Sequence, residues 1–268
     1  MAMPNDLILV RHGESEGNVI QAHIKHGKNF TIPDEFKNRH TYEWRLTEKG
    51  IMQAKKAGLW IRKNISQQFD RYYSSNYLRA METAAHLKLP VAEWFVNLFI
   101  HERNWGIFDR YSHEERQKRF ATDLKSKEIN PFYWSPPRGE SFAELCLRIT
   151  HVLNTLHREC AGQKIILVCH GEIIWAFRII LERITVEQYL ALDKSKNPHD
   201  RIHNGQVVHF TRINPDTGKQ SKYLDWVRSI CPSDLNLSHN QWQKIQRTRY
   251  SNQDLLDLVS KTKRIIND

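Results

Sequence analysis

Several classes of protein are excluded by what this 268-residue chain lacks. Its cysteines, Cys146, Cys160, Cys169 and Cys231, include no CxxC pair, so we predict reduced, buried thiols and a reducing compartment. No apolar run approaches the roughly 20 residues that span a bilayer. The first residues carry no basic segment of the kind that opens a secretion signal. We therefore expect a soluble, cytoplasmic protein without a membrane partner.

The sequence also contains no GxxxxGK[ST] pattern, no internal repeat and no low-complexity tract. The first of these absences excludes a P-loop ATPase. The net charge is +10, yet no block of five or more like charges is present. Such dispersed charge is compatible with an anionic ligand or with a basic surface that aids solubility. It does not favour nucleic acid as a partner.

What the chain does contain is a regular alternation of apolar runs and amphipathic segments. The clearest strand is the unbroken run Ile165–Cys169, and other strands are expected near residues 7–10, 71–74, 90–100 and 206–211. Helices are expected near residues 47–65, 76–87, 112–127, 142–156 and 171–183. Thr47 is a good N-cap, and Ser141 with Glu144 forms a capping box. The alternation predicts an α/β fold, a three-layer α/β/α sandwich with a mostly parallel sheet.

We expect two regions along the chain. Residues 1–230 would form the main domain, with a long loop insertion at about 19–45 that has little regular structure. Loops of this length in compact domains are often lids or binding loops. Residues 231–268 would form a C-terminal helical extension, with polar helices around 240–249 and 252–266.

Four segments share one order, in which a strand is followed by a polar side chain and then by a helix. They are Arg11-His12-Gly13, Ser74 to Arg79, His101-Glu102-Arg103 and Cys169-His170-Gly171-Glu172. Open α/β sheets bind ligands at the carboxyl ends of their strands, where helix N-termini favour anions. Each segment alone has a structural explanation, but their recurrence at equivalent strand ends favours one shared site. A histidine there can attack phosphorus while an arginine holds the phosphoryl oxygens.

Further short matches extend this set over about residues 6–211. They comprise Leu9–Ser15 with Asn18, Leu46–Gly50 with Gln53-Ala54, Ser75 with Arg79–Ala84, Glu102-Arg103 with Trp105-Gly106, Gly139–Ser141, and Val168–Gly171. In this order they resemble the histidine phosphatase superfamily, also called the phosphoglycerate mutase-like superfamily. The resemblance implies a phosphoglycerate mutase-like fold.

The resemblance also implies a set of catalytic roles. His12 would be the nucleophile and form a phosphohistidine. Arg11, Arg79 and His170 would surround the equatorial oxygens and stabilise the charge of the transition state. Glu102 would protonate the leaving oxygen and then activate the hydrolytic water, which requires a raised pKa.

Four further residues would bind substrate, namely Asn18, Ser15, Arg103 and Gly171. No metal ion and no cofactor is implied, because cationic side chains supply the positive charge. Aromatic side chains could frame the mouth of the pocket or anchor loops in the core. They are Tyr42, Trp44, Trp105, Phe132, Tyr133 and Trp134.

Three departures from the mutases favour hydrolysis: the long 19–45 loop, the segment Pro136–Glu140 and the C-terminal extension. We therefore expect a metal-independent phosphomonoester hydrolase that acts on a small phosphorylated metabolite. The alternatives are a cofactor-dependent phosphoglycerate mutase-type transfer and a protein phosphatase or phosphate-binding regulator. A nucleic-acid-binding protein would differ from all of these in a steep loss of binding with salt. The sequence leaves open whether the chain acts alone or as a homodimer.

Overall fold

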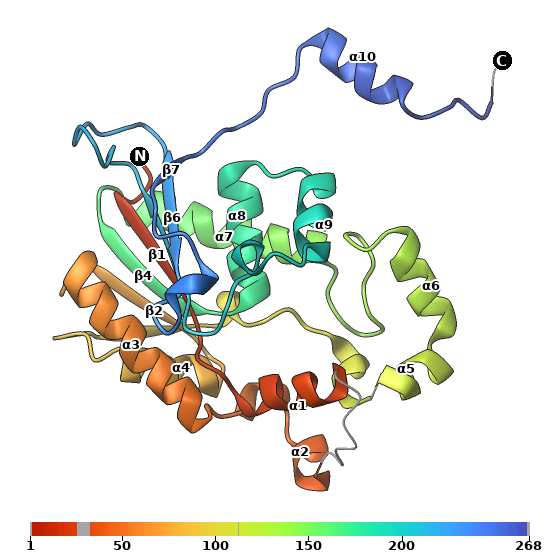
Figure 1. Cartoon of the computed structure of the whole chain (residues 1–268), viewed down its shortest axis with the longest axis horizontal. Helices are drawn as coiled ribbons and strands as arrows, with labels where there is room; N and C mark the ends of the chain where they lie inside the picture. The colour runs from red at the N-terminus through yellow and green to blue at the C-terminus, as the bar shows by residue number, and fades with distance from the viewer. Residues whose placement is uncertain (1, 26–32, 112, 267–268) are drawn as a thin grey trace.

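The computed structural model describes residues 2–25, 33–111 and 113–266, and within them a seven-stranded sheet forms the centre of the molecule (Figure 1). The strand order is β3-β2-β4-β1-β5-β6-β7. The bounds are β1 (Asp6–Arg11), β2 (Arg71–Ser75), β3 (Trp94–Asn97), β4 (Lys164–Cys169), β5 (Val207–Thr211), β6 (Trp226–Ile230) and β7 (Gln243–Lys244).

The sheet is mixed, which corrects the prediction of a mostly parallel sheet. Strands β3, β2, β4 and β1 run parallel, whereas β5, β6 and β7 are antiparallel to their neighbours. The reason lies in the connections. No helix is described between β5 and β6, and antiparallel neighbours need no crossover helix.

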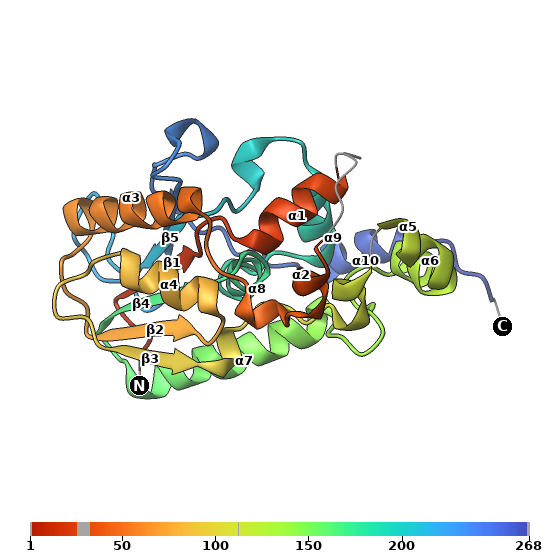
Figure 2. The same cartoon turned by 90° about the horizontal axis from the view of Figure 1, so that it is seen from below.

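Helices cover both faces of the sheet, which confirms the three-layer α/β/α arrangement (Figure 2). Helices α3 (Glu48–Asn64) and α4 (Leu78–His86) pack on one face, and α7 (Phe142–Glu159) and α8 (Gly171–Glu182) on the other. Successive side chains of a strand point to opposite faces. Accordingly, Ile8 and Val10 of β1 join the core beneath α3 and α4, while Leu7 and Leu9 join the other core.

Side-chain caps fix where two of these helices begin. Thr47 Oγ1 accepts a hydrogen bond from the Gly50 amide over 3.1 Å, at the start of α3. Ser141 and Glu144 form the predicted capping box at the start of α7. Helix α9 (Val186–Lys194) opens on a box of the same kind. Short 3-10 helices lie at η2 (Leu98–Ile100), η3 (Gly106–Arg110), η4 (Pro198–Asp200) and η5 (Leu235–Leu237).

The described part of the 19–45 segment is largely regular, so the prediction of little regular structure was wrong there. It holds most of α1 (Glu16–Lys25), α2 (Asp34–Asn38) and the 3-10 turn η1 (Thr41–Glu43), while residues 26–32 lie outside the described ranges. Trp44 organises this region, because its indole is buried and stacks on Phe36 with ring centroids 4.8 Å apart.

The charged helix expected over 112–127 is divided in two, α5 (His113–Arg119) and α6 (Ala121–Ile129), and residue 112 lies outside the described ranges. The division falls at Phe120, whose φ of −130° and ψ of 34° are not helical. Its ring packs against Phe108 and Tyr111, at centroid distances of 5.2 and 5.5 Å. An aromatic anchor thus interrupts a segment whose charge pattern alone indicated one helix.

Of the two helices expected in the C-terminal region, the structure contains only the second. Residues 240–249 form no helix; instead β7 joins the sheet edge beside β6, and Ile245 is buried in the core. Helix α10 (Asn252–Ser260) is present, shorter than expected, and projects away from the body of the protein (Figure 1). A division of the chain at residue 230 stays a prediction. In the described ranges no helix combines the length and apolarity needed to cross a membrane.

Candidate active site

A pocket of about 780 Å³ lies at the carboxyl ends of β1, β2 and β4. These strands are neighbours in the sheet, so the segments that follow them meet. All but one of the predicted site residues line the pocket: Arg11, His12, Ser15, Asn18, Arg79, Glu102, Arg103 and Gly171. The exception, His170, packs its ring edge-on against that of His12, with centroids 5.0 Å apart.

The His12 imidazole is buried and its tautomer follows from its contacts. Nδ1 lies 2.7 Å from the carbonyl oxygen of Gly13. A carbonyl can only accept, so Nδ1 carries the proton and Nε2 presents its lone pair. Arg79 Nε donates to that Nε2 over 3.2 Å. Burial, followed by the charges of Arg79 and Arg11, holds the pKa of His12 well below its usual value, so the ring is neutral.

Two arginines border the His12 ring. Arg79, in the first turn of α4, also donates to the Thr41 carbonyl oxygen over 2.7 Å and stacks on the Tyr77 ring at 4.8 Å. Burial lowers the pKa of Arg79 to about 10, which leaves it charged at neutral pH. Arg11 donates from Nη1 to the Ile202 carbonyl oxygen over 2.5 Å. Its buried Nε has no hydrogen-bond partner among the described residues.

His170 is fully buried at the start of α8. Its Nε2 lies 2.8 Å from Ser75 Oγ, while its buried Nδ1 has no partner in the described part of the chain. Burial and the nearby charge of Arg79 hold the pKa of His170 well below its usual value. Buried polar atoms are normally satisfied, so the open atoms on Arg11 and His170 indicate places where a ligand would bind.

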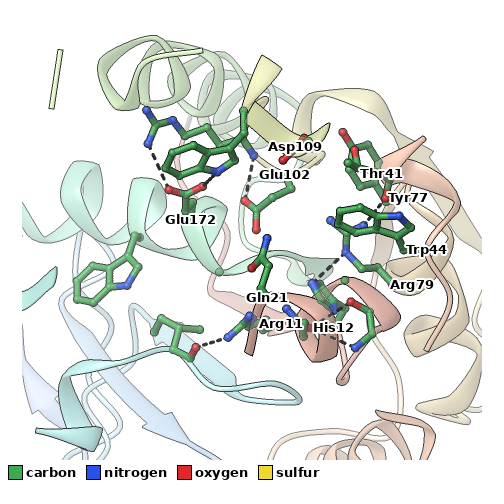
Figure 3. Close-up of a pocket in the computed structure, with 18 of the residues that line it drawn as sticks. Arg11, His12, Gln21, Thr41, Trp44, Tyr77, Arg79, Glu102, Asp109 and Glu172 are labelled. Atoms are coloured by element: carbon green, nitrogen blue, oxygen red, sulfur yellow. Dashed lines mark hydrogen bonds and ion pairs between the residues drawn. The ribbon is translucent and has the colours of Figure 1, made fainter. Parts of the chain in front are cut away.

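Carboxyl groups line the opposite side of the pocket (Figure 3). Burial raises the pKa of Glu102, even though Arg79 and Arg11 lower it. Burial likewise raises the pKa of Asp109 to about 6. It raises the pKa of Glu172 to about 7, with repulsion from Glu102 adding to the effect. The pocket therefore has two arginines around His12 at its floor and, on its wall, carboxyl groups whose pKa values are raised.

Glu172 is a pocket residue to which sequence reasoning assigned no role. Its Oε2 accepts from Trp105 Nε1 over 3.0 Å, and its Oε1 lies 3.3 Å from Arg103 Nη1. The available signal was an acidic residue directly after His170-Gly171, in the first turn of a helix.

Arg103 lines the pocket, but its guanidinium is held by protein groups on every nitrogen. Besides Glu172, it donates from Nε to the Glu140 carbonyl oxygen over 2.7 Å and from Nη2 to that of Trp134 over 3.3 Å. It also stacks on Trp105 at 4.6 Å. Through these contacts Arg103 holds Glu172 in place. A contact between Arg103 and substrate stays a prediction.

The Asn18 amide is oriented by three donors that converge on its carbonyl oxygen. They are the Ser15 amide at 3.1 Å, Ser15 Oγ at 3.1 Å and Asn204 Nδ2 at 3.0 Å. These contacts engage the Asn18 oxygen and not its amino group, and Asn18 lines the pocket. Asn204, which sequence reasoning missed, also donates to the His12 carbonyl oxygen over 3.1 Å.

Two glycines bring the matched segments Leu9–Ser15 and Leu46–Gly50 into direct contact. A Cβ on Gly13 would lie 2.2 Å from the Gly50 carbonyl oxygen, and one on Gly50 would lie 2.0 Å from that of Glu14. The turn after β1 therefore presses directly on the start of α3. Gln53 Oε1 accepts from the Glu14 amide over 2.8 Å and holds the same turn. Leu46–Gly50 and Gln53 thus support the turn that carries His12.

The aromatic side chains divide between the two roles considered. Trp44 and Trp105 line the pocket, whereas Phe132 and Trp134 are buried, with Phe132 in the core beside α7. Tyr42 and Tyr133 are exposed. Gly171 lies beside the Arg11 side chain, where an added Cβ would be 3.4 Å from Arg11 Nε. Across the described ranges, no three His, Cys, Asp or Glu side chains are grouped so that they could hold a metal ion.

Comparison with known proteins places this arrangement in context. Residues 7–199 match the sequence model of the family described as "Histidine phosphatase superfamily (branch 1)". A 2,3-bisphosphoglycerate-dependent phosphoglycerate mutase from Methylorubrum populi is 27% identical over 196 residues, 70% of this chain and 84% of the relative. The enzyme of that name from Parvibaculum lavamentivorans is 28% identical over 200 residues, 71% and 86% of the two chains.

Solved structures with the same fold include two phosphatases. The alpha-ribazole phosphatase from Shigella flexneri superposes with a TM-score of 0.61 at 19% identity, covering 82% of this chain and 96% of its own. A phosphoserine phosphatase from Entamoeba histolytica superposes with a TM-score of 0.56 at 23% identity, covering 77% and 90%.

Proposed function

The chain belongs to the histidine phosphatase superfamily, and we propose that it is a metal-independent phosphomonoester hydrolase acting through a phosphohistidine on a small phosphorylated metabolite. One observation carries the proposal. The unprotonated Nε2 of a neutral, buried His12 faces Arg79, with Arg11 on the same pocket floor and His170 against its ring. An imidazole lone pair among cationic groups suits attack on a phosphate dianion.

In the first step, His12 Nε2 attacks phosphorus, a P–N bond forms and the P–O bond to the leaving group breaks. Glu102 gives its proton to the departing oxygen, for which the raised pKa suits it. In the second step, Glu102 accepts a proton from water, whose oxygen attacks phosphorus. The P–N bond then breaks, which restores His12 and releases inorganic phosphate.

Charge stabilisation would come from the arginines and the second histidine around His12. Arg11 Nε and His170 Nδ1 are the open buried atoms, and binding of the phosphoryl group would give them partners. Arg79 would move its Nε hydrogen bond from His12 to a phosphoryl oxygen as the nucleophile engages. The Asn18 amino group adds a neutral donor. Preorganised donors of this kind supply most of the catalysis in phosphoryl transfer.

A phosphoglycerate mutase-type transfer is the second candidate, because relatives 27–28% identical carry that name. The two reactions share the phosphohistidine and differ in its acceptor, which is water in one case and a second hydroxyl in the other. The distinguishing experiment incubates the protein with 3-phosphoglycerate, with and without 2,3-bisphosphoglycerate, and with a panel of phosphorylated metabolites and phosphopeptides. Phosphate release without isomerisation supports the hydrolase, and isomerisation that exceeds phosphate release overturns it.

A further inference from the structure

The charges around the pocket divide into two unequal regions. Arg11 and Arg79 lie beside His12 on the floor, where the transferred phosphoryl group would bind. The rest of the wall carries the carboxyls of Glu102, Asp109, Glu172 and Asp193. In Figure 3, Glu102, Asp109 and Glu172 lie together across the pocket from Arg11 and His12. Whatever part of the substrate extends beyond the phosphoryl group therefore meets acidic side chains.

The three arginines of this wall each donate to protein groups, Arg103 from every nitrogen and Arg116 and Arg201 from one nitrogen each. Arg103 is held by Glu172 and two backbone carbonyl oxygens. Arg116 donates from Nε to the Phe108 carbonyl oxygen over 3.0 Å, and its charge acts on Asp109. Arg201, which is exposed, donates to the Ser195 carbonyl oxygen over 3.2 Å. Among the described residues that line this wall, the buried cation is Arg103, and protein groups occupy all three of its nitrogens. Arg116 is half-buried and Arg201 is exposed.

Glu172 is the carboxyl of this wall that neighbouring side chains hold in a fixed orientation. Trp105 and Arg103 fix both of its oxygens, and its side chain is 26% exposed toward the pocket. Each carboxylate oxygen can accept more than one hydrogen bond, so capacity remains after these contacts. Trp175 and Leu192 line the pocket as well and give an apolar surface to a carbon skeleton.

We propose that Glu172 is a specificity-determining residue that accepts a hydrogen bond from a hydroxyl or ammonium group on the leaving part of the substrate and repels a second anion there. This inference rests on the proposed hydrolase function and names its substrate class: monophosphate esters with a donor group near the ester and no carboxylate or second phosphate. A carboxylate placed against Glu172 would be repelled by a like charge in a partly desolvated site.

The test uses three two-carbon esters that differ only in the distal group: 2-hydroxyethyl phosphate, phosphoethanolamine and phosphoglycolate. Assays at pH 8 keep Glu172 ionised, since its pKa is about 7. We expect kcat/KM for the hydroxyl or the ammonium ester to exceed that for phosphoglycolate by about tenfold or more. The better of the two donor esters then identifies which group is the natural donor. Equal or higher kcat/KM for phosphoglycolate would overturn the proposal without any variant.

The Glu172→Gln variant tests the assignment to this residue. It keeps the shape of the side chain and removes its charge, so the preference should shrink toward equality, mainly through a higher kcat/KM for phosphoglycolate. Glu182→Gln is the matched control, because Glu182 belongs to the same helix and pairs with Arg178 outside the pocket. A preference unchanged in Glu172→Gln, or reduced equally in Glu182→Gln, would remove Glu172 from this role.

para-Nitrophenyl phosphate separates this proposal from the function on which it rests, because its leaving group carries neither a donor nor an anion near the ester. Hydrolysis of this ester, together with preference for phosphoglycolate, contradicts the specificity proposal alone. Absence of hydrolysis of any ester contradicts the hydrolase function itself.

Discussion

Arg79 Nε and His12 Nε2 are joined by a hydrogen bond of 3.2 Å, so a buried cation holds the lone pair of the proposed nucleophile before substrate arrives. The contact has two physical effects. It opposes protonation of His12, because an added proton would face a buried positive charge. It also orients the ring toward the place where the arginine itself would bind a phosphoryl oxygen.

Replacement of His12 by alanine should abolish turnover, with a loss of at least about a thousandfold in kcat, since the proposed covalent intermediate forms on this residue. Brief incubation with labelled substrate followed by acid treatment should detect an acid-labile phosphoprotein in the wild type only. Turnover and labelling that both persist in His12→Ala would exclude this residue as the nucleophile.

Replacement of Glu102 by glutamine should affect substrates according to their leaving groups. An alkyl ester needs a proton on its departing oxygen, so its rate should fall about a hundredfold or more. Nitrophenyl phosphate, whose phenolate leaves readily, should be affected much less in the phosphorylation step. The measurement is kcat/KM for both esters, and equal losses would contradict the role of Glu102 as the acid.

The pH profile should reflect the directions of two pKa shifts. In the proposed mechanism Glu102 acts as an acid when protonated, and its raised pKa extends that form to higher pH before activity falls as pH rises. Arg79, Arg11 and Arg148 oppose the shift, and Glu172, whose pKa is about 7, lies in the same pocket. In the proposed mechanism His12 acts when neutral, so its lowered pKa places the loss of activity on acidification well below pH 6.5.

We therefore expect kcat/KM for an alkyl ester to be bell-shaped, with its maximum between the lowered pKa of His12 and the raised pKa of Glu102. Glu102→Gln should remove the decline at high pH, whereas Glu172→Gln should leave it in place. A decline that survives in Glu102→Gln would assign it to another group.

Chelation should leave the activity intact, because Arg11 and Arg79 supply the positive charge in the proposed mechanism. Phosphate release in millimolar EDTA should equal that in its absence, with a magnesium-dependent phosphatase assayed alongside to show that the chelator works. Complete loss that added metal restores would contradict the mechanism.

Substitution of Gly50 by alanine should distort the site from a distance, since its Cβ would lie 2.0 Å from the Glu14 carbonyl oxygen. Overpacking of this kind destabilises proteins by about 1–3 kcal/mol. The turn that carries His12 must shift as well, so kcat should fall in the protein that remains folded. Urea unfolding and kcat together measure the two effects.

Gly162→Ala provides the control for Gly50→Ala. Gly162 has a φ of +75° but nothing within 4 Å of an added Cβ. The Gly162→Ala protein should lose about 1 kcal/mol of stability, because alanine is strained in a left-handed backbone, and it should keep its kcat. If Gly50→Ala behaves in the same way as this control, the contact of Gly50 with the turn after β1 does not position His12.

The arrangement of the site could be predicted from the sequence wherever local pattern determines geometry. An apolar strand followed by His12 or His170 specifies a side chain at the sheet's carboxyl edge, and Thr47 and Ser141 mark helix starts. Once β1, β2 and β4 are neighbours, the residues that follow them converge. The roles of these residues are still predictions, whereas their positions are observed.

What could not be predicted depends on contacts between distant segments. The antiparallel strands β5 to β7 follow from connection lengths and from packing at the sheet edge. Asn204 reaches Asn18 across 186 positions of sequence, and no local pattern announces such a contact. The break at Phe120 and the order around Trp44 likewise arise from aromatic side chains that find buried partners.

The central position of β1 has a consequence for how the protein would fail on heating. β1 is flanked by β4 and β5, and its residues Asp6 to Val10 are buried. Amides in such strands exchange with solvent deuterium only when the whole fold opens, whereas those of the exposed helix α10 exchange through local fraying. His12 and His170 follow two of these paired central strands, so thermal inactivation should coincide with cooperative melting of the sheet rather than precede it.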